Sequence, residues 1–375
     1  MRLPLIVFIT ATSGLSISFV SIQTFFCQHS NPPKGFLRLT LQPKRKLKTM
    51  NVKQILIFTF MFLTVGAVHA QDYELVWSDE FDTNTLGTNW NVEVTKAPYN
   101  NELEAYTSRP DNVTIADGNL VLTARREGYG DRAFTSGRVN SMHKVTFTHG
   151  KIEARIKLPH LANGLWPAFW MMGEDFDTVN WPKCGEIDIM EMGMKNAINT
   201  NATDNTVAGT IHWGESIAKH QQFSSGDKTV SQNLTDGYHI FTCEWDDDYL
   251  KFYIDNDATP YFTATIKKGF SRSAYFHKPY FLIFNLAVGG DFTGITNPAD
   301  ITALPQAGSE AQMFIDYVRI YQKKGQHNVS TGIRKVSRMN ATANDAWYDM
   351  AGARVSADSR GILIHQGKII IRQTK

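Results

Sequence analysis

The sequence is poor in cysteine, and most of its length carries no net positive charge. It holds 3 cysteines among 375 residues. Cys27 lies in a leading apolar segment, so Cys184 and Cys243 allow at most one disulfide. Residues 71–321 contain 20 Lys and Arg against 33 Asp and Glu. Because phosphate neutralisation needs a basic face, this acidic block excludes nucleic acid as a partner.

Long windows with a helical period and internal repeats are also missing. Hydrophobic residues make up 42% of the chain and charged residues 20%, which excludes a mostly disordered chain and a polytopic membrane protein. Aromatic residues are plentiful at 12%, with 8 Trp. Most of them are expected to pack in a core, although aromatic faces also suit sugar surfaces.

The first seventy residues read as targeting sequence. They carry 8 Lys and Arg and no Asp or Glu. The apolar stretch Ile55–Val68 follows a short basic start at Met50 and ends in small residues before Ala70. This pattern predicts a signal peptide that begins at Met50 and is cleaved after Ala70, with residues 1–49 as an upstream extension. The alternative is that Leu3–Phe26 anchors the chain in a membrane. We therefore expect a secreted protein, or one held at the cell surface or in the periplasm.

Secretion leaves two states open for the remaining cysteines. An oxidising compartment permits a disulfide between Cys184 and Cys243. Each of them lies in an apolar run, however, where a buried free thiol is equally natural. Two buried thiols are favoured here, and the disulfide is the alternative.

Short alternating or apolar runs, separated by turn residues such as Asp117-Gly118 and Asp236-Gly237, fill residues 71–321. Regular short strands with turns between them predict an all-β sandwich or barrel. A unit of about 250 residues is enough for a sizeable core. The runs expected to form strands include Asn119–Arg125, Gly150–Leu158, Tyr238–Trp245, Leu250–Asp255, Tyr280–Val288 and Met313–Tyr321.

Two further segments follow this domain. Residues 322–345 are polar and basic and rich in Ser, Thr, Asn and Gly, which predicts a linker. Residues 346–375 resume strand character, with runs at Ile362–His365 and Lys368–Arg372. So short a segment cannot bury a core alone, so it either docks on something or serves as a recognition tag.

Three carboxylates fall within the apolar run Gly185-Glu186-Ile187-Asp188-Ile189-Met190-Glu191. Alternate residues of a strand share a face, so Glu186 and Asp188 point the same way. Strict alternation would bury Glu191 on the core face, where an unpaired carboxylate is costly. One β-bulge between Asp188 and Glu191 shifts the phase by one residue. The pattern therefore predicts a bulge and three carboxylates that face one cleft.

Clustered carboxyls of this kind suit glycoside hydrolysis. Retaining enzymes use one carboxyl as nucleophile and another as acid/base, roughly 5–5.5 Å apart. A third carboxyl between them raises the proton affinity of its neighbours and pushes pKa values apart. The alternatives are a Ca²⁺ site and an exposed acidic face. The carboxylates lie in an expected strand rather than in a loop, which disfavours a metal site. Apolar residues lie between them, which disfavours an exposed acidic face.

The spacing of Glu186, Asp188 and Glu191 resembles the active-site strand of family 16 glycoside hydrolases, in the bulged form of the laminarinase, agarase and carrageenase branch. The resemblance covers roughly residues 73–321. It implies a concanavalin A-like β-jelly-roll sandwich with a long concave cleft, and hydrolysis of β-glycans with retention. It assigns the nucleophile to Glu186, the acid/base to Glu191 and an assisting role to Asp188.

Other segments are similar to the endo-β-1,3-glucanase members, among them Gly164–Met171, Gly209–Trp213 and Phe284–Gly290. This resemblance implies β-1,3-glucan of the laminarin type as the substrate, and mixed-linkage β-1,3-1,4-glucan fits the same site. Trp faces stack on sugars, while Asn, Arg and His bond to hydroxyls. The residues that would line the cleft are Asn101, Arg138, Trp166, Trp170, His212 and Asn285. A structural role is the alternative for Arg138, Trp170 and His212.

Two other functions compete with this reading. A non-catalytic β-glucan-binding module on the same sandwich typically lacks the carboxylates, and all three are present here. A hydrolase of another glycan, such as agar or carrageenan, would keep the carboxylates. A sulfated substrate needs basic cleft residues, and the acidic balance of residues 71–321 disfavours it.

No cofactor is required for this chemistry, and a monomer is expected. Several relatives hold a structural Ca²⁺, and the resemblance places its ligands at Glu80, Gly118 and Asp316. Three ligands are few for Ca²⁺, so waters would complete the shell. The alternative is that Glu80 and Asp316 are surface carboxylates.

The C-terminal runs Trp347–Val355, Gly361–Ile364 and Gly367–Arg372 resemble the short sorting tails of secreted Bacteroidetes proteins. This resemblance implies export through the outer membrane or surface attachment, with the outer-membrane secretion machinery as a partner. The alternative is a small extra hairpin packed on the catalytic domain.

Overall fold

The computed structural model describes residues 73–331 and four short stretches of the C-terminal segment, 347–349, 354–356, 361–365 and 368–372. The expected upstream extension, signal peptide and cleavage site lie outside the described residues. Among the residues that are described, no helix has the length and apolar character needed to cross a membrane.

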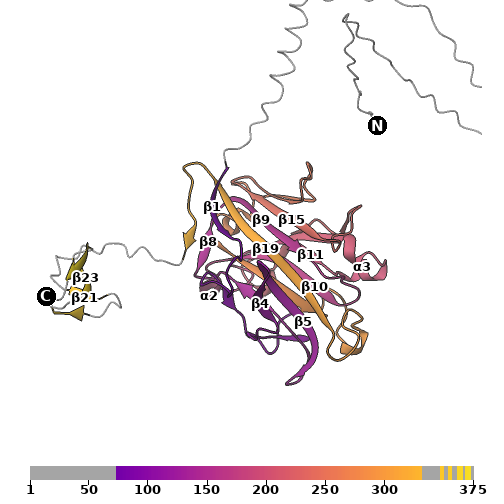
Figure 1. Ribbon diagram of the computed structural model, residues 1–375. Helices are drawn as coiled ribbons and strands as arrows, with labels where there is room; N and C mark the ends of the chain where they lie inside the picture. The colour runs from indigo at the N-terminus through magenta and orange to yellow at the C-terminus, as the bar shows by residue number, and fades with distance from the viewer. Residues whose placement is uncertain (1–72, 332–346, 350–353, 357–360, 366–367, 373–375) are drawn as a thin grey trace, which may run out of the picture. The chain divides into compact units, whose positions relative to one another are not determined.

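Residues 73–331 form two antiparallel-dominated β-sheets with a shared core (Figure 1). The first sheet has the spatial order β17 (Phe262–Thr265), β16 (Tyr249–Ile254), β15 (Tyr238–Trp245), β9 (Gly150–Lys157), β19 (Glu310–Lys323), β5 (Asn119–Tyr129), β6 (Arg132–Ser136) and β3 (Glu104–Tyr106). At its margins β1 (Tyr73–Asp79) pairs with β19, and β4 (Val113–Ala116) pairs with β5.

The second sheet carries the strand with the three carboxylates, β11. Its order is β13 (Gln221–Ser224), β12 (Thr206–Trp213), β11 (Glu186–Met192), β10 (Leu165–Gly173), β18 (Tyr280–Val288), β7 (Arg138–Asn140) and β2 (Asn91–Val92). In addition β14 (Lys228–Thr229) pairs with β12, and β8 (Val145–Phe147) pairs with β18 and β20 (Ser330–Thr331). The only helices described are single turns: α2 (Phe176–Val179), α3 (Lys195–Asn199), η1 (Thr203–Asn205), η2 (Ile217–Lys219), η3 (Ser273–Tyr275) and η4 (Pro298–Asp300).

The core lies between the two sheets and follows the alternation of the sequence. Along β9, Ile152, Ala154 and Ile156 are buried while the residues between them are partly exposed. From the second sheet, Phe169 and Phe284 stack with ring centroids 4.8 Å apart. Burying apolar surface stabilises a fold by roughly 25 cal/mol per Å². The predicted all-β sandwich is confirmed, and each run expected to form a strand does so.

Both cysteines of the domain are buried free thiols. Cys243 lies in the main core, and Cys184 lies in a smaller apolar cluster with Phe281 and Ile283. Burial raises the pKa of Cys184 to about 12. The favoured state of two buried thiols is confirmed.

The C-terminal end of the sandwich extends past the expected boundary at residue 321. Strand β19 runs to Lys323, and the Gln322 side-chain amide donates to the His149 carbonyl at 2.9 Å. Ser330 then pairs with Thr146 of β8. The first part of the segment 322–345, expected as a linker, therefore packs against the sandwich up to residue 331.

The described parts of the C-terminal segment form a separate four-stranded sheet in the order β22 (Arg354–Val355), β21 (Trp347–Asp349), β23 (Gly361–His365) and β24 (Lys368–Arg372). Trp347 stacks on His365 with ring centroids 4.2 Å apart. The two runs expected as strands are β23 and β24.

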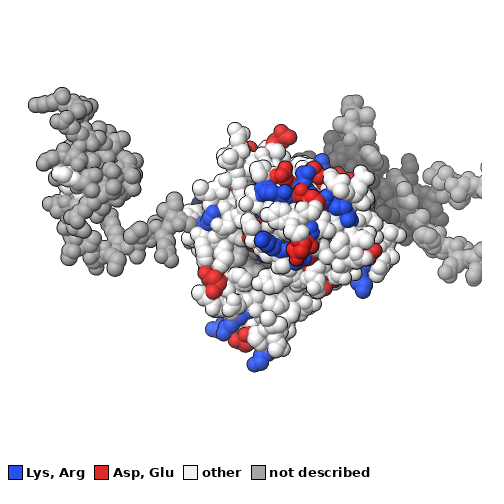
Figure 2. Space-filling model, turned by 90° about the horizontal axis from the view of Figure 1, so that it is seen from below, with Lys and Arg blue, Asp and Glu red and all other residues white. Residues whose placement is uncertain are grey.

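Charge is dispersed on one face of the sandwich. Figure 2 shows a largely uncharged face on which acidic and basic side chains are interspersed rather than gathered by sign. Such a surface has no broad basic field that would attract a polyanion.

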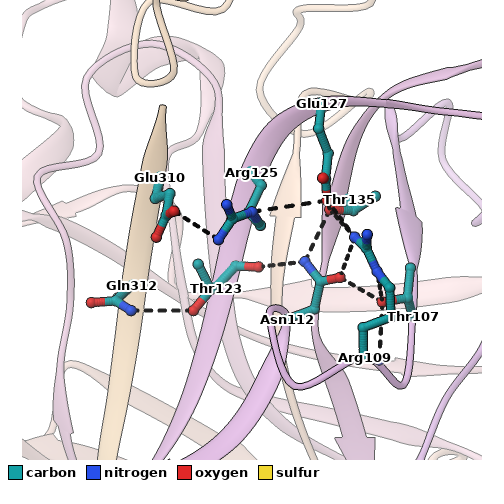
Figure 3. A network of polar contacts seen from close by, with 9 residues as sticks. All are labelled: Thr107, Arg109, Asn112, Thr123, Arg125, Glu127, Thr135, Glu310 and Gln312. Carbon is teal, nitrogen blue, oxygen red and sulfur yellow. Dashed lines mark hydrogen bonds and ion pairs between the residues drawn. The ribbon is translucent and has the colours of Figure 1, made fainter. Parts of the chain in front are cut away.

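A polar network ties the first sheet to the loop before β4 (Figure 3). Arg109 of this loop pairs with Glu127 of β5 and donates to Thr135 of β6 at 3.1 Å. Arg125, also on β5, pairs with Glu310 of the neighbouring strand β19 at 2.7 Å. Three strands and one loop are thereby linked, which supports the sheet without touching the carboxylates of β11.

Candidate active site

Strand β11 contains the predicted bulge. Asp188 lies opposite Thr210 of β12, and Glu191 lies opposite Ala208. Ile189 and Met190 therefore share the single partner Gly209, which is a two-against-one bulge. The Phe252 ring packs against Gly209 so closely that an added Cβ would lie 2.5 Å from it.

The bulge places all three carboxylates on one face of the sheet. On β10, Trp170 lies opposite Asp188 and Ala168 lies opposite Glu191. Trp170 and Ala168 are two residues apart on a regular strand, so they share a face. Asp188 and Glu191 share that face in turn, as the sequence predicts.

A glycine starts this strand for a steric reason. Gly185 has φ +74, and a Cβ there would lie 2.1 Å from the Tyr280 hydroxyl. Only glycine combines this left-handed backbone with so close a neighbour. The turn at Gly185 leads directly into Glu186, the first residue of β11.

Strand β12 brings His212 against two of the carboxylates. His212 lies opposite Glu186 in the register. Its Nε2 atom is 3.2 Å from Asp188 Oδ2 and 3.7 Å from Glu186 Oε1. These side chains are at most 16% exposed, so the imidazole lies within a desolvated acidic cluster.

Strand β10 supplies the partner of the third carboxylate. The Trp166 indole Nε1 donates to Glu191 Oε1 at 3.1 Å. One face of the Trp166 ring is covered by Phe292, whose ring centroid lies 4.7 Å away with the two planes 13° apart. Trp166 is therefore held in place both by stacking and by its bond to Glu191.

Three of the remaining predicted substrate residues, Trp170, Asn285 and Arg138, form one connected chain on the same sheet. Trp170 Nε1 donates to Asn285 Oδ1 at 2.7 Å, and the Arg138 guanidinium lies 4.9 Å from the Trp170 ring. Arg138 also pairs with Glu93 at 2.9 Å. Arg138 thus makes the ion pair that was its alternative role, while it still borders the Trp170 ring.

Asn101 lies apart from this chain. Its side chain is exposed and donates to Asp291 Oδ1 at 2.9 Å. Asp291 is next to Phe292, the stacking partner of Trp166. Asn101 therefore contacts the loop that carries Phe292. The structure does not bring Asn101 into contact with the carboxylates.

Burial and mutual charge make the cluster retain protons. Burial, and then the charge of Asp188, raises the pKa of Glu186 to about 8 and that of Glu191 to about 8. Burial raises the pKa of Asp188 well above its usual range. Three crowded carboxyls cannot all ionise at low cost. The site therefore holds transferable protons near neutral pH.

Three neighbours of the site were not predicted. His220 Nε2 lies 2.9 Å from His212 Nδ1, and the Trp181 ring lies 4.6 Å from the His220 ring. Phe292 stacks on Trp166. Trp181 lies shortly before Glu186 in the sequence, which could have predicted its place near the site. His220 and Phe292 lie in loops that show no sequence pattern from which their place could be predicted.

The predicted calcium ligands do not form a ready cation site. Both oxygens of Glu80 accept from Arg319, at 2.9 and 2.7 Å. Asp316 Oδ2 pairs with Arg155 at 2.6 Å. Gly118 lies in the turn between β4 and β5. In this arrangement arginines neutralise both carboxylates, and the calcium site stays an untested prediction.

Within the described residues, two groups bring at least three possible metal donors within 4.8 Å of one another. They are Glu186, Asp188 and His212 in the site, and His149, Asp247 and His277 elsewhere. The carboxylates of the first group lie on the face of β11 for which the sequence predicts glycoside hydrolysis.

Comparison with known proteins finds relatives of the sandwich domain. Residues 74–323 match a family model described as β-porphyranase A–D, GH16 domain. The α subunit of clotting factor G from Tachypleus tridentatus is 36% identical over 257 residues, 68% of this chain and 35% of that protein. Glucan endo-1,3-β-glucosidase A1 from Niallia circulans is 32% identical over 277 residues, 67% of this chain and 38% of that protein. The chain thus spans little more than a third of the length of these two relatives.

A shorter relative and two solved structures match over nearly their whole length. The β-glucanase of Rhodothermus marinus is 32% identical over 294 residues, 75% of this chain and 98% of that protein. A GH16 protein of Bacteroides ovatus, solved with a G4G4G3G product of mixed-linkage glucan, is 40% identical with a TM-score of 0.60, covering 66% of this chain and all of that one. The laminarinase catalytic domain of Thermotoga petrophila is 34% identical with a TM-score of 0.56, covering 68% and 100%. With the carboxylate strand, the jelly-roll sandwich and these matches in agreement, the chain belongs to glycoside hydrolase family 16.

Proposed function

We propose that this protein is a retaining endo-β-glucanase that hydrolyses β-1,3-glucan and accepts mixed-linkage β-1,3-1,4-glucan. One observation carries the proposal: Glu186, Asp188 and Glu191 project from one face of β11, because a bulge corrects their phase. Loss of these carboxylates would leave a binding module, and their presence in a desolvated cluster supports hydrolysis.

In the first step the Glu186 carboxylate attacks the anomeric carbon of the sugar. The Glu191 carboxyl gives its proton to the glycosidic oxygen, so the bond to the leaving sugar breaks and a covalent glycosyl–enzyme ester forms. The raised pKa of Glu191 keeps that proton available near pH 7. The Trp166 N–H then stabilises the carboxylate that Glu191 becomes.

In the second step Glu191 acts as a base. It takes a proton from water, whose oxygen attacks the anomeric carbon and releases Glu186 with net retention. Asp188 lies on the same face of β11 as Glu186, and burial raises the pKa of Asp188 well above its usual range. When the proton of this pair resides on Asp188, Glu186 is ionised for attack. His212 Nε2 faces both groups and adds a second polar contact.

The choice of glucan rests on sequence similarity. The Rhodothermus marinus relative is a β-glucanase, and the Bacteroides ovatus and Thermotoga petrophila structures concern mixed-linkage glucan and laminarin-type glucan. The bulged motif supports placement in the laminarinase branch. Trp166 and Trp170, both partly exposed on the carboxylate face, would stack on successive sugars.

One specific finding favours a second candidate, a porphyran-type galactan. The family model that matches residues 74–323 is that of β-porphyranases. Sulfated galactan requires free cationic groups, yet Arg138 is already paired with Glu93. The charges shown in Figure 2 are likewise interspersed. We therefore place this substrate second.

We also propose that the protein is exported and acts outside the cytoplasm or at the cell surface. The basic start, apolar run and small residues before Ala70 support a signal peptide. The strand runs of residues 346–375 support a sorting tail that the outer-membrane secretion machinery reads. Activity measured on intact cells, compared with lysate and medium, tests this location.

The substrate is tested by measuring reducing ends after incubation with laminarin, lichenan, agarose, porphyran and carrageenan. Release from laminarin, with or without lichenan, is the expected result, and Glu186→Gln serves as the inactive control. Release only from porphyran would transfer the assignment to the second candidate. Chromatography of early products distinguishes endo from exo action, since endo action gives a spread of oligosaccharides.

A further inference from the structure

Two histidines and an aspartate from three different turns meet at one end of the sandwich. His149 ends the turn before β9, Asp247 lies in the β15–β16 turn, and His277 precedes β18. His149 Nε2 is 2.9 Å from His277 Nδ1, and His149 Nδ1 is 3.5 Å from Asp247 Oδ1. Neither the proposed mechanism nor the core packing requires this arrangement.

The hydrogen bonds assign the proton positions. His277 Nε2 lies 3.0 Å from the Ile266 carbonyl oxygen. A carbonyl only accepts, so His277 Nε2 carries the proton and its Nδ1 presents a lone pair. His149 Nε2 then donates to that lone pair, which leaves His149 Nδ1 unprotonated toward Asp247. A single proton thus lies between His149 Nε2 and His277 Nδ1, and the Asp247 carboxylate faces the other nitrogen of His149.

The surroundings hold both rings in place. His149 is only 27% exposed and packs edge-on against Trp245 at 5.1 Å. Trp245 Nε1 donates to the carbonyl of Phe276, the residue before His277, at 3.0 Å. A histidine whose second nitrogen bonds a backbone carbonyl is the usual orientation of a metal ligand. Asp247, in contrast, is 93% exposed and free to adjust.

We propose that His149, His277 and Asp247 bind a divalent transition metal ion, with zinc as the best match. The three donor atoms lie within 4.8 Å of one another. Imidazole nitrogens and a carboxylate oxygen are ligands that zinc accepts, and water completes its tetrahedron. Ligands about 2.0–2.1 Å from zinc are roughly 3.3 Å apart, so the ring nitrogens need to separate by only a few tenths of an ångström.

Such an ion would join three turns that are distant in the sequence. It would replace the proton shared by the rings and bridge the β8–β9 turn, the β15–β16 turn and the segment before β18. Ligands that bind only the folded state stabilise it in proportion to the logarithm of their concentration. The expected effect of zinc is therefore on stability.

The test is titration of the purified protein, without a histidine tag, with ZnCl₂ by calorimetry, followed by melting curves with zinc and with EDTA. Zinc is expected to bind and to raise Tm by several degrees. His277→Gln and His149→Asn are expected to weaken zinc binding at least tenfold. Asparagine suits position 149, where φ is +61.

His160→Gln is the matched control, because His160 pairs with one carboxylate, Asp204, and has no histidine partner among its recorded contacts. Its zinc affinity is expected to equal that of the unaltered protein. Melting in EDTA shows whether each variant is folded, and Co²⁺ absorption reports tetrahedral coordination directly. Undiminished zinc affinity in His277→Gln and His149→Asn would overturn the proposal. So would loss of the zinc site in His212→Gln, which would place the ion among the catalytic carboxylates.

Discussion

The Trp166 indole donates to Glu191 at 3.1 Å while Phe292 stacks on one face of the indole ring. The bond favours the ionised form of Glu191 and therefore lowers its pKa, against the larger effect of burial. Trp166, for which sugar stacking is predicted, thereby also influences the protonation of Glu191, the proposed acid/base.

Trp166→Phe keeps an aromatic ring but removes the N–H donor. The pKa of Glu191 is expected to rise, so the basic limb of the pH profile of kcat/KM, near 8 in the unaltered protein, moves upward. kcat/KM falls roughly tenfold, because a hydrogen bond to a charged group contributes about 1.5 kcal/mol. Phe292→Leu, which alters only the stacking, is the control. A basic limb that stays in place would show that the bond does not influence Glu191.

Glu186→Gln removes the nucleophile and leaves a side chain of equal size. Hydrolysis of laminarin is expected to fall by at least about 10³-fold, because no glycosyl ester can form. Affinity for laminarin, measured by calorimetry or affinity electrophoresis, should change little. Turnover close to that of the unaltered protein would remove Glu186 from the nucleophile role.

Glu191→Ala removes the acid/base but leaves the nucleophile. With an activated aryl glucoside, whose leaving group needs no proton, the glycosyl ester still forms and then accumulates. Azide attacks this ester without a general base, so added azide is expected to restore turnover and give a β-glycosyl azide. Absence of both rescue and azide product would point to another residue as the acid/base.

The carboxylate cluster also makes stability depend on pH. The pKa of Glu186 rises from 4.5 in the unfolded chain to about 8 in the folded one, so the folded state binds more protons between these values. Stability contributed by the protonated carboxyl is fully present below pH 4.5 and is lost as pH rises toward 8. Glu186→Gln cannot ionise, so its Tm relative to the unaltered protein is expected to increase from pH 5 to pH 8. Thermal melts across this range measure the difference, and a constant offset would contradict it.

His220 is expected to hold the tautomer of His212. His212 Nε2 faces the carboxylates of Asp188 and Glu186, so its Nδ1 is left to accept from the Nε2–H of His220 at 2.9 Å. Burial lowers the pKa of His220. His212 then carries its own proton on Nε2, toward Asp188 and Glu186. His220→Phe keeps the ring contact with Trp181 but removes the donor.

We expect kcat of His220→Phe to fall about tenfold with KM nearly unchanged, and His220→Gln, which retains an N–H donor, to recover part of it. Nitrogen chemical shifts of labelled histidine report the tautomer directly. An unchanged tautomer in His220→Phe would show that His220 only packs against His212.

Much of this fold and site could be read from local patterns. Alternation along short runs predicted the strands, and the two-residue gap between Asp188 and Glu191 predicted the bulge, because burying a lone carboxylate is costly. The buried thiols followed from apolar flanks in the same way. Each of these inferences concerns residues on one strand, where period and spacing are visible in the chain.

The class of fold, the three carboxylates and their shared face are thus visible in local sequence patterns. The folded structure sets their surroundings: His220 and Trp181 beside His212, Phe292 stacked on Trp166, and Glu93 on Arg138. It also decided that residues up to 331 pack on the sandwich, that Glu80 and Asp316 face arginines, and that His149 meets His277. These contacts join residues from loops and strands that lie far apart in the chain, and strand order and register, which no local pattern encodes, bring them together.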